Sequence, residues 1–208
     1  MGQIKNIIFD LGGVIINLDI PRTIAEFNKL APKPFETIYT QLQQSPVFDQ
    51  FDKGETTESD FFSEIMKALS IEISHSQFVY AWNAMLLDFP INRIEMLLKL
   101  KSKYRLFLLS NTNETHIAQL QTILFNQHGY KNLKPFFEKV YYSCRIGMRK
   151  PDKEIFEYVL RENKLDPSET LFIDDSPQHI EGGRKSDIQS HFLSKEKDVV
   201  DLISELNL

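Results

Sequence analysis

The stretch that decides the fold is Ile7-Ile8-Phe9-Asp10-Leu11-Gly12-Gly13-Val14. Its first three residues are apolar and predict a short buried strand, and Asp10 stands where that strand ends. The glycine pair that follows is suited to a tight turn. A carboxylate in this place has no packing role, and open α/β sheets carry their chemistry at the carboxyl edge of the strands. Asp10 is therefore a candidate metal ligand and a candidate nucleophile for phosphoryl groups.

Three more apolar runs lead into polar residues in the same way. They are residues 106–109 before Ser110, residues 140–143 before a loop that reaches Lys150, and residues 171–173 before Asp174. Helices are expected after them, over residues 114–126, 152–163 and about 178–185. Continuous hydrophobicity is typical of strands that helices cover on both faces. The repetition predicts an α/β fold, a doubly wound parallel, Rossmann-like core of three layers.

Residues 17–89 follow a different pattern. Helical runs are expected over 23–30, 35–44, 58–69 and 77–87, with no good strand among them, and Thr57 with Asp60 resembles a capping box. These helices either pack on the same core or form a cap inserted after the first strand, above the polar edge. The position of the insertion favours the cap. We therefore expect a catalytic core of residues 1–16 and 90–208 and a helical cap of residues 17–89.

Composition narrows the class of partner. Of 208 residues, 42% are hydrophobic and sixteen are Phe, so a sizeable core is available. The net charge of −5 comes without a basic stripe, which argues against nucleic acid and favours a small molecule. The single cysteine, Cys144, is expected to be a core thiol at the end of a strand. The apolar runs are far shorter than the ~20 residues that a bilayer requires, so no membrane span and a reducing, cytoplasmic setting are expected. The oligomeric state stays open.

The four motifs, in this order and with a helical insertion after the first, resemble the haloacid dehalogenase-like hydrolase superfamily. The resemblance extends from Asn6 to about Phe192. The motif strings look closest to a bacterial subgroup that includes α-D-glucose-1-phosphate phosphatase. The resemblance implies that Asp10 attacks phosphorus and forms an aspartyl-phosphate. It also implies that Ser110 and the backbone N–H of Asn111 hold a phosphoryl oxygen.

The same resemblance implies a magnesium site. Asp175, with Asp174 beside it, would bind Mg²⁺ together with a carboxylate oxygen of Asp10 and the backbone carbonyl of Gly12, while Lys150 would neutralise charge on nucleophile and phosphate. Charge arithmetic agrees, because three carboxylates would share one small volume with one ammonium. Two like charges ~4 Å apart repel by roughly 4 kcal/mol at an effective dielectric of 20. A divalent cation brings the site close to neutrality, and oxygen ligands suit Mg²⁺.

Each motif alone has a plainer explanation. Asp174 and Asp175 could cap a helix, Lys150 could be a loop lysine, and one residue of the run 110–113 could cap the next helix. All three arising together by chance is improbable. The four motifs in order therefore favour a functional site.

One position departs from the family pattern. Most phosphatases of the superfamily have a second aspartate two residues after the nucleophile, as general acid and base, and this chain has Gly12. Three explanations stay open: substrates with better leaving groups, such as sugar 1-phosphates; another proton donor, from the cap or His179; or a site that binds phosphate with little turnover. The resembling subgroup shares the glycine and includes a phosphatase, which favours the first. Trp82 and Phe48 could line a substrate pocket or simply pack.

The leading hypothesis is a Mg²⁺-dependent phosphoric monoester hydrolase acting on a small phosphorylated metabolite, with sugar phosphates, and sugar 1-phosphates in particular, favoured. A dehalogenase using the same aspartate on carbon would need no metal, so Asp174 and Asp175 argue against it. A phosphate-binding module with little turnover is the third possibility, and Gly12 keeps it open. The sequence does not specify the substrate.

Overall fold

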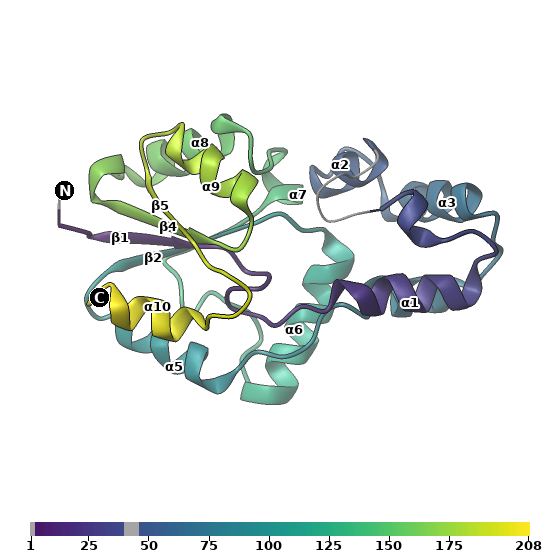
Figure 1. Ribbon diagram of the computed structural model, residues 1–208, viewed down its shortest axis with the longest axis horizontal. Coiled ribbons are helices and arrows are strands. Elements are labelled where there is room, and N and C mark those ends of the chain that lie inside the picture. Colours follow the sequence, from purple (N-terminus) through teal and green to yellow (C-terminus); the bar gives the residue numbers. More distant parts are fainter. Residues whose placement is uncertain (1–2, 40–45) are drawn as a thin grey trace.

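The structure, a computed structural model, describes residues 3–39 and 46–208. Its centre is a parallel sheet with the strand order β3-β2-β1-β4-β5 (Figure 1). The strands are β1 (Asn6–Phe9), β2 (Arg105–Ser110), β3 (Lys139–Tyr142), β4 (Thr170–Asp174) and β5 (Gln189–Phe192). The first strand of the chain lies in the middle, so the sheet grows outward from it on both sides. The predicted α/β fold with a parallel sheet is confirmed.

Helices cover both faces of this sheet, which gives three layers (Figure 1). Packed on one face are α5 (Ile91–Leu100), α6 (Glu114–His128) and α10 (Val199–Glu205), and on the other α8 (Lys153–Asn163) and α9 (Pro177–Arg184). Successive strand residues point to opposite faces. Accordingly, Ile7 and Phe9 join the cluster that contains α5, α6 and α10, whereas Ile8 joins the cluster of α8 and α9. Burial on both faces explains the continuous apolar run.

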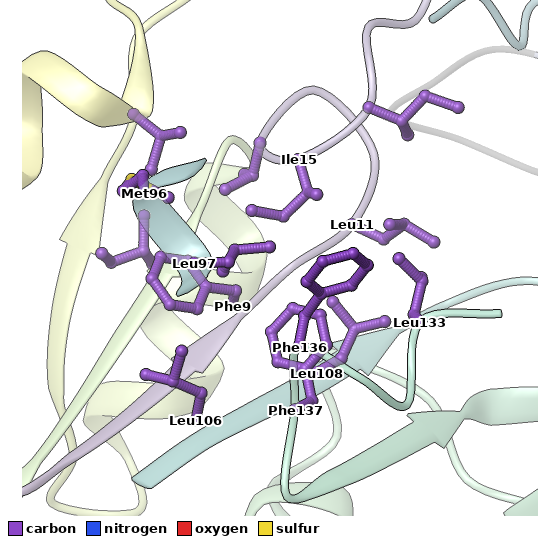
Figure 2. Packing of buried hydrophobic residues seen from close by; sticks show 14 of the residues in the cluster. Phe9, Leu11, Ile15, Met96, Leu97, Leu106, Leu108, Leu133, Phe136 and Phe137 are labelled. Carbon is purple, nitrogen blue, oxygen red and sulfur yellow. The ribbon is translucent and has the colours of Figure 1, made fainter. Parts of the chain in front are cut away.

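Figure 2 shows the first of these clusters at close range. Phe9 of β1 packs with Met96 and Leu97 of α5, and Phe136 and Phe137 lie beside Leu108 of β2. The turn after β1 contributes Leu11 and Ile15 to the same cluster. The loop that carries the glycine pair is thus anchored by apolar side chains on either side of it, which fixes the position of Asp10.

The helices between residues 20 and 83 have a hydrophobic cluster of their own. They are α1 (Ile20–Leu30), the 3₁₀ turn η1 (Phe35–Thr37), α2 (Pro46–Asp52), α3 (Glu58–Leu69) and α4 (His75–Asn83). The cluster is mainly aromatic and is formed by Phe27, Phe35, Tyr39, Phe48, Phe51, Phe61, Phe62, Ile65, Leu69, Ile71, Phe78, Ala81 and Trp82. It is separate from the two clusters at the sheet. The division into a cap segment, residues 17–89, and a core stays a prediction, which this separation supports.

Local sequence explains where these helices begin. The Thr57 hydroxyl accepts a hydrogen bond from the backbone N–H of Asp60, as expected, and Ser74 forms a full capping box with Gln77 at the start of α4. The cap segment meets the core where α2 lies beside α7 (Ser143–Ile146) (Figure 1). It also meets the core where α4 packs against α6.

Three local expectations need correction. The helix expected over residues 35–44 is wrong in its described part, where only the short η1 turn forms, and residues 40–44 lie outside the described residues. The strand expected over residues 140–143 ends at Tyr142, because Ser143 begins α7. Cys144 therefore lies on that short helix, half-buried rather than in the core. Burial still raises the pKa of its thiol to about 12, which leaves it unreactive near neutrality.

The sequence analysis did not predict strand β5 or helices α5 and α10. The sequence of β5, Gln-Ser-His-Phe, is largely polar because β5 is an edge strand and its residues are half-buried or exposed. The helices α5 and α10 follow no motif-bearing strand, although each supplies apolar residues to the core. In the described parts of the chain, no helix is both long and apolar enough to cross a membrane.

The aromatic cluster yields a test of the cap segment. Phe61 is fully buried and stacks on Phe51 with ring centroids 4.0 Å apart. Phe61→Ala should lower the free energy of unfolding by about 3–5 kcal/mol. Trp82, the single tryptophan, lies in the same cluster, so its fluorescence during urea unfolding reports on this region. The matched control is Tyr80→Ala, whose side chain is exposed and whose loss should change the free energy by no more than about 0.5 kcal/mol. Equal effects of the two substitutions would contradict the packing described here.

Candidate active site

The sheet topology explains why residues far apart in sequence meet. β1 and β4 are hydrogen-bonded neighbours with Phe9 opposite Ile173, so the residues that follow them, Asp10 and Asp174, lie side by side at the carboxyl edge. The backbone N–H of Asp10 donates to the carbonyl of Ile173 at 2.9 Å, which extends the pairing by one residue. The four predicted motifs thus converge because the carboxyl ends of adjacent parallel strands share one edge.

Lys150 is the centre of this convergence. Its side chain is fully buried, and its ammonium group donates to Asp10 Oδ1 at 2.7 Å and to Asp174 Oδ2 at 2.6 Å. Asn111 fixes the lysine backbone, because its side-chain amide donates to the carbonyl of Lys150 at 2.8 Å and accepts from its N–H at 2.9 Å. The Asn111 side chain is therefore a clamp between two predicted motifs, a role that the sequence did not reveal.

The two neighbouring aspartates have different surroundings. Asp174 is fully buried, and besides Lys150 it accepts from the backbone N–H of Ser176 at 2.8 Å and lies 3.0 Å from His179 Nδ1. Asp175 stays partly exposed and lines the cavity. Oxygens of Asp10, Asp174 and Asp175 come within 4.8 Å of one another, a spacing that could hold a cation. The oxygens of Asp174 are already engaged by hydrogen-bond donors, which leaves Asp175 better placed for a metal.

Electrostatics at this cluster follow from burial and charge. Burial raises the pKa of Asp10, although Lys150 opposes the shift. Burial alone would also raise the pKa of Asp174, but Lys150 and His179 outweigh it and lower that pKa. The two carboxylates likewise overcome the burial of Lys150 and raise its pKa, so the ammonium stays charged. Burial, with repulsion from Asp10 and Asp174, raises the pKa of Asp175 to about 7. The pocket thus carries excess negative charge that a cation would relieve.

The two glycines have distinct structural roles. Gly13 has a φ of +70°, and a Cβ there would overlap Asp175 Oδ2, so both its conformation and its surroundings require glycine. Gly12 has no such φ. A Cβ on Gly12 would come within 2.6 Å of Leu18 Cδ1, so a leucine side chain fills the space next to this position.

The predicted phosphate-binding residues follow β2. Ser110 is buried as the last residue of that strand, and Ser110 and Asn111 both line the cavity beside Asp10. The capping alternative is correct for Asn113, whose side chain accepts from the backbone N–H of His116 at the start of α6. Ser143 holds the intervening residue, since its hydroxyl accepts from the N–H of Thr112 and donates to its carbonyl.

A cavity of about 840 Å³ opens above these residues and is bounded by both core and cap segment. Such a volume is in the range of small-molecule sites. Phe48 and Trp82, considered from the sequence as pocket or packing residues, line it and also belong to the aromatic cluster. Sequence reasoning missed Asp52 of α2 and Arg149, which pairs with Asp49 of α2 across the cavity wall. Arg149 directly precedes Lys150 in the third motif but was given no role, whereas Asp52 belongs to none of the strand-end motifs and only the fold brings it to the site.

Two histidines, His116 and His179, line the cavity, and their contacts indicate different roles. His116 is buried, stacks on Trp82 with ring centroids 4.9 Å apart, and has a pKa that burial lowers to about 4. His179, retained as a candidate proton donor, lines the cavity but faces Asp174 with Nδ1. That contact favours a role in holding Asp174 rather than in donating to a leaving group.

A family comparison agrees with this geometry. The model of haloacid dehalogenase-like hydrolases matches residues 4–187. The chain belongs to this family. A HAD family enzyme from Bacteroides thetaiotaomicron, solved as a mutant in complex with magnesium and inorganic phosphate, superposes with a TM-score of 0.90 at 35% identity, covering 96% of this chain and 98% of that one. The family resemblance read from the sequence is confirmed.

Two further relatives of this HAD-like hydrolase are similar over nearly the same length. A HAD-like family hydrolase from Porphyromonas gingivalis has a TM-score of 0.88 at 29% identity, covering 99% of this chain and 98% of its own. A curated relative, D-ribitol-5-phosphate phosphatase of Bacteroides thetaiotaomicron, is 30% identical over 183 residues, which is 88% of each chain. Solved dehalogenases at 16–17% identity show the fold alone.

The raised pKa of Asp175 yields a test of the metal site. A cation must displace any proton that Asp175 carries, so Mg²⁺ affinity should weaken by roughly tenfold for each pH unit below about 7. Above pH 8 the affinity should level off. Calorimetric titration of the substrate-free protein with MgCl₂ between pH 5.5 and 8.5 measures this dependence. Asp175→Asn removes the titrating group and should weaken binding at every pH; a Mg²⁺ affinity that is constant across the range in the wild type would contradict the account.

Proposed function

We propose that this protein is a Mg²⁺-dependent phosphatase that transfers the phosphoryl group of a small sugar or polyol phosphate to Asp10 and then to water. The observation that carries the proposal is the buried Lys150, which holds Asp10 at the floor of the cavity next to the acidic cluster. The family supports hydrolysis, and the relative named for D-ribitol 5-phosphate supports this substrate class.

In the first step, a carboxylate oxygen of Asp10 attacks phosphorus, the bond from phosphorus to the leaving oxygen breaks, and the departing alkoxide takes its proton from water. Lys150 holds Asp10 through Oδ1, which leaves Oδ2 as the attacking oxygen. Ser110, at the end of β2, and the backbone N–H of Asn111 bind a phosphoryl oxygen. Phosphoryl transfer depends on this kind of positioning and charge stabilisation more than on covalent help from the protein.

In the second step, water attacks the phosphorus of the aspartyl-phosphate. The bond between phosphorus and Asp10 breaks, inorganic phosphate leaves, and the carboxylate is restored. Lys150 faces the aspartate throughout, so its charge favours the carboxylate as a leaving group. The buried position of the ammonium strengthens this effect, because charges interact more strongly away from water.

The donor set fits Mg²⁺. Carboxylate oxygens of Asp10 and Asp175 lie close together, and within the described residues no hydrogen bond uses the carbonyl of Gly12. We assign these three oxygens to the cation, with Asp174 serving mainly to hold Lys150. Bound there, Mg²⁺ would supply neutralisation of the phosphoryl oxygens. Magnesium and inorganic phosphate in the solved relative from Bacteroides thetaiotaomicron support the assignment.

The missing general acid shapes the substrate preference. Gly12 stands two residues after the nucleophile and has no carboxyl group that could protonate the leaving oxygen. The side chain of Leu18 fills the space beside it. A general acid contributes about 10²–10⁴-fold, most for leaving groups of high pKa. Sugar 1-phosphates, with their more acidic anomeric oxygen, stay favoured by this argument, whereas the relative is named for the phosphate of a primary alcohol. The proposed substrate class therefore includes phosphates on the anomeric oxygen and phosphates on a primary alcohol.

The nucleophile is tested by Asp10→Asn, which preserves the size of the side chain but removes the attacking oxyanion. Phosphate release should fall by at least about 10³-fold while the circular dichroism spectrum stays unchanged. Asp19→Asn, a carboxylate before α1 with an exposed partner, serves as the matched control and should keep wild-type rates. Substantial activity of Asp10→Asn, with deamidation excluded by mass spectrometry, would remove Asp10 from the mechanism.

The role of Gly12 is tested by a series of phosphomonoesters with graded leaving-group pKa. Without a proton donor, kcat/KM should rise steeply as the leaving-group pKa falls. Introducing Gly12→Asp together with Leu18→Ala, which clears the space, should flatten that slope, and Leu18→Ala alone is the control. A flat dependence in the wild type, with chemistry rate-limiting, would show that another residue donates the proton.

A further inference from the structure

The catalytic residues occupy only the core side of the cavity. On the opposite side, the cavity is lined by Phe48 and Trp82 of the cap segment together with the carboxyl group of Asp52. None of these groups takes part in phosphoryl transfer as described above. Because a monoester bound at Asp10 must place its leaving group in the remaining volume, this cap wall faces the part of the substrate that differs from one phosphate ester to another.

A chain of hydrogen bonds across the boundary between cap and core fixes the orientation of Asn113. His116 Nε2 lies 3.2 Å from the carbonyl of Trp82, which can only accept, so Nε2 carries the proton. His116 is neutral, as its lowered pKa requires, so its Nδ1 is an acceptor and faces the Asn113 amide nitrogen at 3.4 Å. Asn113 Oδ1 already accepts from the backbone of His116. The second hydrogen of the Asn113 amide is not used in these contacts, and Asn113 lies close enough to Asp52 to lower the pKa of that carboxyl against the effect of burial.

Asp52 and Asn113 both border the cavity. The Asp52 side chain lies between cap segment and core yet stays partly exposed, because it faces the cavity. The two oxygens of the carboxyl group carry enough lone pairs to accept from a ligand as well as from a neighbouring protein group. Burial raises the pKa of Asp52 to about 7, so near neutrality the group is present in both its ionised and its protonated form. Such a carboxyl can accept from one hydroxyl group and donate to another.

The charges around Asp52 determine which ligand it suits. Arg149, which lines the cavity, is paired with Asp49, and Lys195 lines it from the core side, after β5, next to Glu196. A leaving group that carried a carboxylate or a second phosphate would meet Asp52 without a dedicated cation beside it. Hydroxyl groups would meet a hydrogen-bonding partner in Asp52, and the carbon skeleton that carries them would lie in a cavity that Phe48 and Trp82 also line.

We infer that Asp52, which faces the cavity from the cap segment, binds a hydroxyl group of the substrate's leaving group and selects neutral, polyhydroxylated phosphate monoesters over those that carry a second anionic group. The inference deepens the proposed function and rests on it. Asp52 is the residue that contacts substrate.

The test compares three substrates in the presence of Mg²⁺: D-ribitol 5-phosphate, phosphoglycolate and p-nitrophenyl phosphate. The wild type should prefer the polyol phosphate to phosphoglycolate by at least about 100-fold in kcat/KM. Asp52→Ala should raise KM for D-ribitol 5-phosphate about tenfold, the loss of one hydrogen bond to a charged group, and leave kcat/KM for the aryl phosphate within about twofold. Asp52→Asn retains hydrogen bonding without the charge, so it should recover most of the polyol KM while discrimination against phosphoglycolate falls at least tenfold.

The control is Glu64→Gln, an exposed carboxylate on α3 away from the cavity, which should change none of the three activities. Equal losses with all three substrates in both Asp52 variants would show that Asp52 only supports the fold. Unchanged polyol KM and unchanged discrimination would show that it does not contact the substrate. Either result overturns the assignment while the phosphatase activity of the wild type stands. A wild type that hydrolyses none of the three overturns the proposed function, and this assignment with it.

Discussion

The rest of the site depends on the ion pairs that the buried ammonium group of Lys150 forms with Asp10 and Asp174. Burying a charge away from water costs free energy unless the charge is paired and hydrogen-bonded. Asp10 and Asp174 each form an ion pair with the ammonium group and accept a hydrogen bond from it. These partners come from adjacent strands, whereas Lys150 comes from the loop before α8. The pairing therefore ties three parts of the core together at one point. It also directs the nucleophile toward the cavity.

The balance of charge at that point makes the site incomplete without a cation. Lys150 compensates for only one of the carboxylates in the cluster, and the raised pKa of Asp175 shows how unfavourable a further negative charge is there. Phosphate would add to this excess. The same residues that hold the lysine therefore create the need for Mg²⁺, and nucleophile, lysine and metal ligands are parts of one electrostatic unit rather than independent features.

Most of this unit could be predicted from sequence because it lies at strand ends, where short apolar runs stop at polar residues. The strand ends after Phe9, Leu109 and Ile173 locate it to within a residue or two. The residues that escaped prediction act from other places. Asn111 clamps Lys150 through its side chain, and Asp52 reaches the cavity from a helix of the cap segment, a relationship that depends on how the segments pack. The edge strand β5 escaped because an edge position tolerates polar residues.

The most direct test of the account is a crystal structure of the protein grown with Mg²⁺ and beryllium fluoride, which forms a tetrahedral analogue of an aspartyl-phosphate. The expected result is beryllium bonded to a carboxylate oxygen of Asp10, fluorines contacting Lys150 and Ser110, and Mg²⁺ bound to Asp10 and Asp175. Beryllium fluoride bonded to another residue, or a well-ordered site without Mg²⁺ at Asp175, would contradict the central claim that these residues form a magnesium-dependent phosphoryl-transfer centre.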